Sequence, residues 1–165
     1  MSRTLAQERP VEGDPDLLAR FHDIFASPAF DLVGGEVLAL DGRHGRSRLR
    51  FRPSARLLNP LGTIQGGMLT VMLDSTAAIA AIAKSGVTIF LPTLEIKTSF
   101  IAPARPRSLI GIGQCIHLGR SVAFVEGALY DEEGGHLIAR ASATARPVPI
   151  ARALSGHSPK PRAKS

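Results

Sequence analysis

A glycine pair and one carboxylate, eight residues apart, are the groups in this chain best suited to chemistry. Gly66 and Gly67 open a long apolar run in which Asp74 is the only ionisable residue before Lys84. The run predicts a helix over about 66–84 that is buried on all sides. A buried carboxylate is costly unless it is used or satisfied, so we expect a specific role for Asp74.

The spacing of these groups constrains any site that uses both of them. The N–H groups at the start of a helix lack partners within it and lie at its positive end, where they could stabilise a developing oxyanion. Asp74 lies about 12 Å further along the helix axis than Gly66 and about 80° around it. One chain cannot bring both groups to one small substrate, whereas two antiparallel helices could. If both are catalytic, the site lies at a homodimer interface.

The elements around this helix predict one α+β domain. Asp14-Pro15 indicates a helix start, and Ser27-Pro28 indicates where that helix ends. Strands are predicted at about 32–40, 46–52, 92–101, 107–117, 121–130 and 136–146. The short connections between the last four favour antiparallel neighbours. We therefore predict an antiparallel sheet of about six strands, wrapped around the helix, over residues 14–147. Residues 1–13 and a basic tail at 148–165 are predicted to be disordered.

Composition excludes several classes of partner. The net charge of +6 falls to +2 without the four basic residues of the last fifteen, and the body shows no cluster typical of nucleic-acid binding. A solvated tail is the simpler interpretation, although it could tether the protein to an acidic partner. The apolar run is too short for a membrane span, the N-terminus lacks an apolar signal segment, and the single cysteine suits a reducing compartment. We expect a cytoplasmic protein that binds neither nucleic acid nor membrane.

Three segments together resemble the hotdog-fold acyl-CoA thioesterases, most closely the phenylacetate-pathway (PaaI-type) branch. These are Asn59-x-x-Gly62-Thr63-x-Gln65-Gly66-Gly67, then Asp74, then Pro92-Thr93-Leu94-Glu95-Ile96-x-x-x-Phe100-x-x-Pro103-Ala104. The resemblance covers about residues 28–146. It implies a hotdog fold, homodimers whose sheets join edge to edge, and often dimers of dimers (homotetramers). It also implies an acyl-CoA substrate and no cofactor apart from the coenzyme A of that substrate.

The resemblance assigns catalytic roles residue by residue. Asp74 matches a general base or nucleophile, and Gly66 matches the glycine whose N–H polarises the thioester carbonyl. Asn59 matches a side chain that orients the carbonyl or the attacking water, and Thr93 stands where a hydroxyl positions water. Gln65 occupies the place of the usual histidine, and glutamine can donate a hydrogen bond but does not titrate near neutral pH.

Further residues are predicted to bind the substrate, with simpler explanations beside them. The set comprises Gln65, Gly67, His117, Gly119, Arg120 and Arg146. Arginines suit the phosphates of coenzyme A, but a solvated surface charge is equally consistent with the sequence. Asp74, taken alone, could equally cap a neighbouring backbone group. The acyl group, and the choice between coenzyme A and an acyl-carrier protein, stay open.

Other chemistries find little support in the sequence. There is no Gly-x-Ser-x-Gly motif, Gly111-Ile112-Gly113 lacks the third glycine of a dinucleotide loop, and the five histidines lack metal-ligand spacing, so no metal is expected. The alternative to an enzyme is a non-catalytic hotdog module that binds acyl-CoA or lipid, which the glutamine at position 65 motivates.

Overall fold

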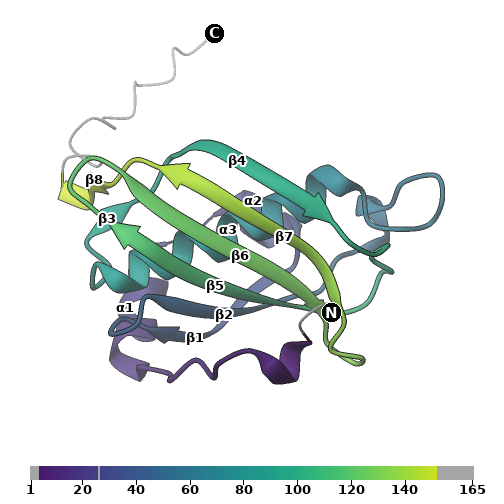
Figure 1. Ribbon diagram of the computed structural model, residues 1–165, viewed down its shortest axis with the longest axis horizontal. Coiled ribbons are helices and arrows are strands. Elements are labelled where there is room, and N and C mark those ends of the chain that lie inside the picture. Colours follow the sequence, from purple (N-terminus) through teal and green to yellow (C-terminus); the bar gives the residue numbers. More distant parts are fainter. Residues whose placement is uncertain (1–3, 26, 152–165) are drawn as a thin grey trace, which may run out of the picture.

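The computed structural model describes residues 4–25 and 27–151 (Figure 1). Its elements follow the chain as a short 3₁₀ helix, two helices, two strands, another 3₁₀ turn, the long helix, and six strands. In order they are η1 (Leu5–Gln7), α1 (Pro15–Ile24), α2 (Pro28–Leu32), β1 (Gly35–Asp41), β2 (Arg46–Phe51), η2 (Ala55–Leu57), α3 (Gly66–Lys84), β3 (Ile89–Phe90), β4 (Thr93–Phe100), β5 (Leu109–Leu118), β6 (Ala123–Asp131), β7 (Leu137–Ala145) and β8 (Val148–Pro149).

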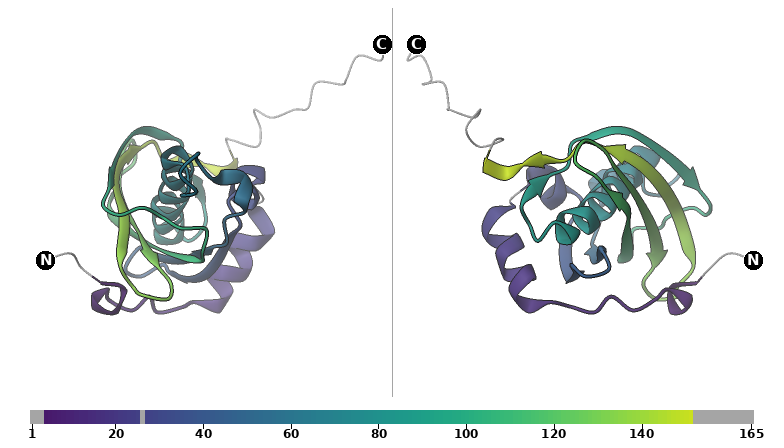
Figure 2. Two further views of the ribbon diagram at one scale, coloured as in Figure 1. Left: turned by 90° about the vertical axis from the view of Figure 1, so that its right-hand side faces the viewer. Right: turned by 60° about the vertical axis from the view of Figure 1, so that its left-hand side comes forward.

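Six strands form one antiparallel sheet that curves around α3. Their order across the sheet is β1-β2-β5-β6-β7-β4, and β3 pairs with β8 in a separate two-stranded ribbon. Figure 2 shows α3 enclosed by the sheet on one side, with α1 on the other. The prediction of an α+β domain with about six strands around a long central helix is confirmed.

The neighbours of β4 differ from the prediction. β4 and β5 follow one another in the chain, but β4 lies at the sheet edge beside β7, and β5 pairs with β2 and β6. The β1–β2 hairpin covers one side of α3 by joining the sheet, and it joins through the pairing of β2 with β5. β4 therefore closes the opposite edge, where Ile101 N–H continues the pairing by donating to Ile138 O at 2.8 Å.

The N-terminal third also contains a helix that was not predicted. Asp14 caps α1 as expected, because its Oδ1 accepts from Leu17 N at 3.0 Å. Ser27 does not end that helix but caps α2, its Oγ accepting from Phe30 N at 3.3 Å. The strand predicted from residue 32 therefore begins only at Gly35, after Gly34 turns the chain with φ of +65°.

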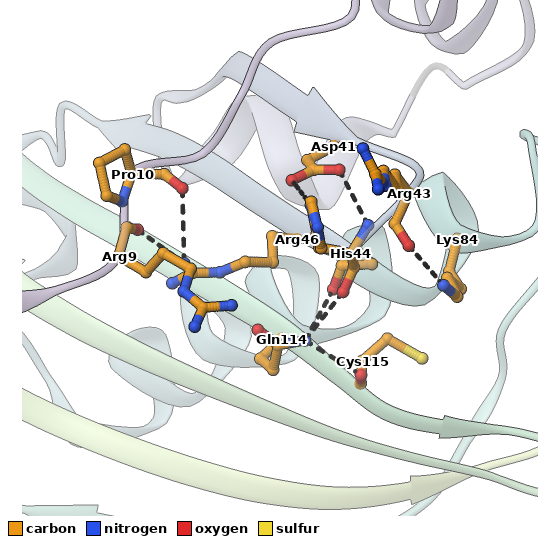
Figure 3. A network of polar contacts seen from close by, with 10 residues as sticks. Arg9, Pro10, Asp41, Arg43, His44, Arg46, Lys84, Gln114 and Cys115 are labelled. Atoms are coloured by element: carbon orange, nitrogen blue, oxygen red, sulfur yellow. Dashed lines mark hydrogen bonds and ion pairs between the residues drawn. The ribbon is translucent and has the colours of Figure 1, made fainter.

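Residues 4–13, predicted to be disordered, instead form a strap across the sheet. Leu5 N–H donates to Gly135 O at 2.8 Å, and Tyr130 OH contacts the Glu8 carboxylate. Arg46 is 5% exposed, and its Nη1 donates to Arg9 O at 2.7 Å (Figure 3). A buried guanidinium requires acceptors, and the strap supplies them.

The boundary at the C-terminal end of the domain also shifts by a few residues. Val148–Pro149, assigned to the tail by the sequence, pair with Ile89–Phe90. Residues 1–3 and 152–165, for which disorder was also predicted, lie outside the described residues.

The inner face of the sheet approaches α3 closely because small residues line it. A Cβ on Gly113 would lie 2.2 Å from Thr76 O, and one on Gly127 would lie 3.0 Å from Leu73 O. The fully buried hydroxyl of Ser47 donates to Thr76 O at 2.8 Å. Backbone of the helix and backbone of the sheet are thus nearly in contact.

The prediction that α3 is buried on all sides needs correction. One stripe of the helix is half-buried or exposed, comprising Gly67, Val71, Asp74, Ser75 and Ala78. By length and composition alone α3 could cross a membrane. In the fold it is the helix that the sheet encloses, and its burial against the strands accounts for its apolar composition.

Because α3 and the sheet are in tight contact, one added methyl group between them should lower the stability of the fold strongly. Gly113→Ala should lower the free energy of unfolding by about 2 kcal/mol or more, because the clash is with backbone that cannot move aside. For a chain of this size the melting temperature should fall by roughly 4–8 °C. Gly13→Ala is the matched control, since a Cβ there would meet only Ala39 Cβ, at an ordinary 3.7 Å, and it should leave stability unchanged or slightly higher. Equal melting temperatures for the two variants would contradict the close-packing account.

Candidate active site

Asp74 is held by a hydroxyl at the start of β4. Thr93 Oγ1 donates to Asp74 Oδ1 at 2.6 Å, and both side chains are half-buried. A register shift in the β4–β7 pairing falls between Thr93 and Glu95. Further along the same two elements, Thr70 Oγ1 and Thr98 Oγ1 are 3.2 Å apart. The helix and the edge strand therefore run side by side, and this contact aims the Asp74 carboxylate.

The glycine pair lies at the other end of this contact. Gly66 is the first residue of α3, and a Cβ on it would lie 3.1 Å from the Phe100 ring at the end of β4. Gln65 is the N-cap residue, but its exposed side chain makes no capping hydrogen bond. Met68 N–H donates to Gln65 O at 2.8 Å, so the N–H groups of Gly66 and Gly67 are the donors that a ligand can reach at the positive end of α3.

Asn59 organises the loop that leads to the glycines. Its Nδ2 donates to Thr63 Oγ1 at 2.8 Å, and its Oδ1 accepts from Leu61 N and Thr63 N at 2.9 and 3.2 Å. Ile64 N–H then donates to Ala104 O at 2.8 Å and ties the loop to the body of the protein. The side chain of Asn59 is thus engaged within its own loop, where it shapes the approach to Gly66.

A shallow cleft of about 350 Å³ opens beside Gly66. Its lining includes Thr63, Phe100 and Ile101, and the two apolar side chains are 54% and 53% exposed. An exposed apolar surface of this kind next to free helix amides suits an elongated ligand with one polar carbonyl.

One chain keeps the two halves of the predicted site apart. Gly66 packs against Phe100 and Asp74 bonds Thr93, and these two partners are the last and first residues of β4. The separation of about 12 Å along the helix is therefore preserved in the fold. Asp74 and Thr93 form one half of the site, and Gln65, Gly66 and Gly67 form the other.

The remaining predicted binding residues gather at the Thr93 end of the sheet. Strand pairing runs across it from Thr93 to Ala145, Ala123 and Leu118. Arg146 follows directly, its N–H donating to Pro92 O at 2.9 Å. The other predicted residues at this end of the sheet are His117, Gly119 and Arg120. They are separated from Thr93 by three strand spacings, or about 14 Å. His117 and both arginines are exposed.

Cys115 lies outside both halves of the site. Burial raises the pKa of its thiol, and the nearby Lys84 offsets this only in part. A thiol with a raised pKa is a poor nucleophile at neutral pH. Among the described residues, no three His, Cys, Asp or Glu side chains gather as metal ligands would.

A second cleft, of about 430 Å³, lies beside Asp74 and was not predicted. It is bounded by α1, α2, β1 and the stripe of α3 that carries Ser75 and Ala78. Three phenylalanines line it, at positions 21, 25 and 30, in a chain with only seven. That concentration within ten residues was the available signal in the sequence.

Comparisons with known proteins agree with this geometry. The thioesterase superfamily model matches residues 61–138, which include α3 and β4. No curated protein has a sequence that matches the chain.

Three solved structures illustrate the likeness. A phenylacetic acid degradation-related protein of Ralstonia eutropha JMP134, described as a putative thioesterase, is 32% identical with a TM-score of 0.70, covering 80% of this chain and 98% of its own. Escherichia coli PaaI, from the phenylacetic acid degradation operon, shares the fold at 15% identity and a TM-score of 0.71, covering 80% and 93%. A Streptococcus mutans UA159 protein solved with acetyl-CoA shares it at 17% identity and 0.62, covering 70% and 89%.

The Ralstonia relative is matched over nearly its whole length, and the family model spans the helix and strand that carry Asp74 and Thr93. The chain therefore belongs to the thioesterase superfamily and is a PaaI-like thioester hydrolase with the hotdog fold.

Proposed function

We propose that the protein is an acyl-CoA thioesterase whose active site forms between two copies of the chain. The hydrogen bond from Thr93 to Asp74 is the observation that carries this proposal, because it fixes a half-exposed carboxylate on the open stripe of α3. Asp74 of one copy and Gly66 of the other would meet if two α3 helices packed antiparallel along that stripe. The same packing would supply a second, equivalent site.

The proposed reaction divides the work between the two halves. With Oδ1 held by Thr93, Asp74 Oδ2 accepts a proton from a water molecule, whose oxygen attacks the thioester carbonyl carbon. The N–H of Gly66 donates to the carbonyl oxygen as negative charge develops there. The carbon–sulfur bond then breaks, and the leaving thiolate takes up the proton. The products are a carboxylic acid and coenzyme A, and no cofactor takes part.

Coenzyme A as the carrier is supported by two observations. The neighbour from Streptococcus mutans has the same fold and was solved with acetyl-CoA. In this chain Arg146 is exposed beside Thr93, and Arg120 is exposed at the same end of the sheet, about 14 Å away, where both can contact phosphate groups. Gln65, exposed next to Gly66, can donate a second hydrogen bond to the carbonyl oxygen without changing protonation.

Edge pairing of two sheets would complete the dimer. β4 is the last strand of the six-stranded sheet, so in the described part of the chain its outer edge has no strand beside it. Most of its side chains are half-buried or exposed, including Leu94, which is 65% exposed. An edge of this length invites pairing with a second copy, and the same strand carries Thr93 to the interface.

Asp74→Asn should lower kcat for acyl-CoA hydrolysis at least about a hundredfold, because the amide cannot accept the proton of water. Release of coenzyme A, followed with a thiol reagent over a panel of acyl-CoAs, measures this. Glu126→Gln is the matched control, since it removes an exposed carboxylate on β6 and should retain activity. Full activity of Asp74→Asn would rule out its proposed role. Binding of acyl-CoA by the wild type without any hydrolysis would instead favour the non-catalytic module.

Thr93→Val should lower kcat by about tenfold to a hundredfold, the range expected when a hydrogen bond to a charged group is lost. KM should change little, because the hydroxyl contacts the carboxylate and not the substrate. Thr93→Ser should restore most of the rate. Thr98→Val is the control, since it removes a similar hydroxyl from the same strand but leaves Asp74 bonded. Equal losses for the two valine variants would indicate a merely structural role for Thr93.

Mixing two inactive variants tests whether the site is shared between copies. Gly66→Pro removes the N–H at a helix position that tolerates proline, and Asp74→Asn removes the base. Refolded together in equal amounts, they should recover about one quarter of wild-type activity, since half of the dimers are mixed and each has one intact site. No recovery, with mixed dimers verified by two affinity tags, would place the whole site within one chain.

A further inference from the structure

The cleft beside Asp74 is an aromatic-walled cavity in a chain poor in aromatic residues. We call it the phenylalanine cleft and define it by Phe21, Phe25, Phe30, Val37, Ala78 and Ile79, which form its apolar wall. Phe21 and Phe25 stack with ring centroids 4.8 Å apart, and Phe30 packs edge-on against Phe51 at 5.8 Å. Phe25 also meets Phe90 at 5.0 Å. Five of the seven phenylalanines therefore form this wall or support it.

The wall is fixed by the fold independently of any ligand. Phe21 is 5% exposed and Val37 is 5% exposed, and both belong to the main core. Phe30 rests against Gly35, where a Cβ would lie 2.5 Å from its ring. Rigid aromatic walls around about 430 Å³ are the properties of a preformed ligand pocket.

The cleft begins next to the proposed catalytic base. Ser75, which follows Asp74, and Ala78, one helical turn further on, both line it. Ala78 lies about 6 Å along the helix axis from Asp74 and on the same side of α3. A thioester carbonyl at Asp74 can therefore extend its acyl substituent past Ala78 into the cleft.

Charge among the lining residues favours one end of the substrate. Asp31 and Glu36 line the cleft and are exposed. Glu36 pairs with Arg52 at 2.8 Å and with Arg50 at 3.6 Å, so Asp31 is the carboxylate whose charge disfavours the phosphates of coenzyme A. The arginines at the sheet end beside Thr93 offer those phosphates the opposite sign. The acyl end, which is apolar, is the part that matches the phenylalanine cleft.

We infer that the phenylalanine cleft binds the acyl group of the thioester and that Ala78 determines which acyl groups fit. This inference rests on the proposed function for the position of the carbonyl. Extension of the acyl chain along the wall should strengthen binding by about fourfold for each buried methylene. A side chain larger than alanine at position 78 narrows the passage between Asp74 and the cleft.

Ala78→Leu should change the acyl-length dependence of hydrolysis. The ratio of kcat/KM for octanoyl-CoA to kcat/KM for acetyl-CoA should fall at least about tenfold relative to wild type. Phe30→Leu, which enlarges the cleft, should shift the preference toward longer or bulkier acyl groups. Ser142→Leu, which adds the same bulk at an exposed position on β7, should leave the profile unchanged. Light scattering should show the same assembly for all three variants.

A binding experiment separates this inference from the proposed catalysis. In the Asp74→Asn background, calorimetry should show tighter binding of octanoyl-CoA than of acetyl-CoA, and Ala78→Leu should remove the difference. If calorimetry gives this result but the wild type hydrolyses no acyl-CoA, the catalytic proposal is overturned and the inference that the cleft binds the acyl group is still supported. The inference would be overturned if the two acyl-CoAs bound with equal affinity. It would also be overturned if Ala78→Leu lowered kcat/KM by the same factor for every acyl length.

Discussion

The close approach of α3 to the inner face of the sheet is the constraint on which the remaining structure depends. Gly111, Gly113 and Gly127 leave no side chain between strand and helix, and Ser47 bonds directly to the helix backbone at Thr76. A backbone contact of this kind fixes the rotation of the helix as well as its distance, because any turn would place a larger residue against the strands. The stripe that faces away from the sheet is thereby determined.

Asp74 is placed by that rotation. With Thr76 and Ala77 buried against the sheet, Asp74 falls on the open stripe, at the border between the edge strand β4 and the α1–α2 side. It therefore bonds Thr93 on one side, and the next residue, Ser75, lines the phenylalanine cleft on the other. A carboxylate in this position is half-buried, and one of its oxygens is held by the Thr93 hydroxyl. The fold thus resolves the cost of a carboxylate in an apolar helix through partial exposure and one hydroxyl.

The sequence predicted the parts of this arrangement that depend on local pattern. The central helix, the strand at 46–52, and the distance between Gly66 and Asp74 all follow from periodicity and spacing. It could not predict that β4 joins β7, because strand order depends on contacts distant in the chain. It also could not show that Arg46 is buried beneath the strap, since a strand of alternating arginines has the pattern of a solvated face.

The position of Gln65 at the start of α3 determines whether this residue must transfer a proton or only donate a hydrogen bond. A histidine at this position could donate a hydrogen bond, transfer a proton, or both. In this chain the residue stands at the positive end of α3, next to two glycines whose first-turn amides already favour negative charge. The carbonyl oxygen therefore needs donors and no proton, and Asp74 serves both proton transfers of the proposed reaction, from water and to the leaving thiolate. A neutral amide that donates over the whole pH range is compatible with that division, because the two tasks lie in opposite halves of the site.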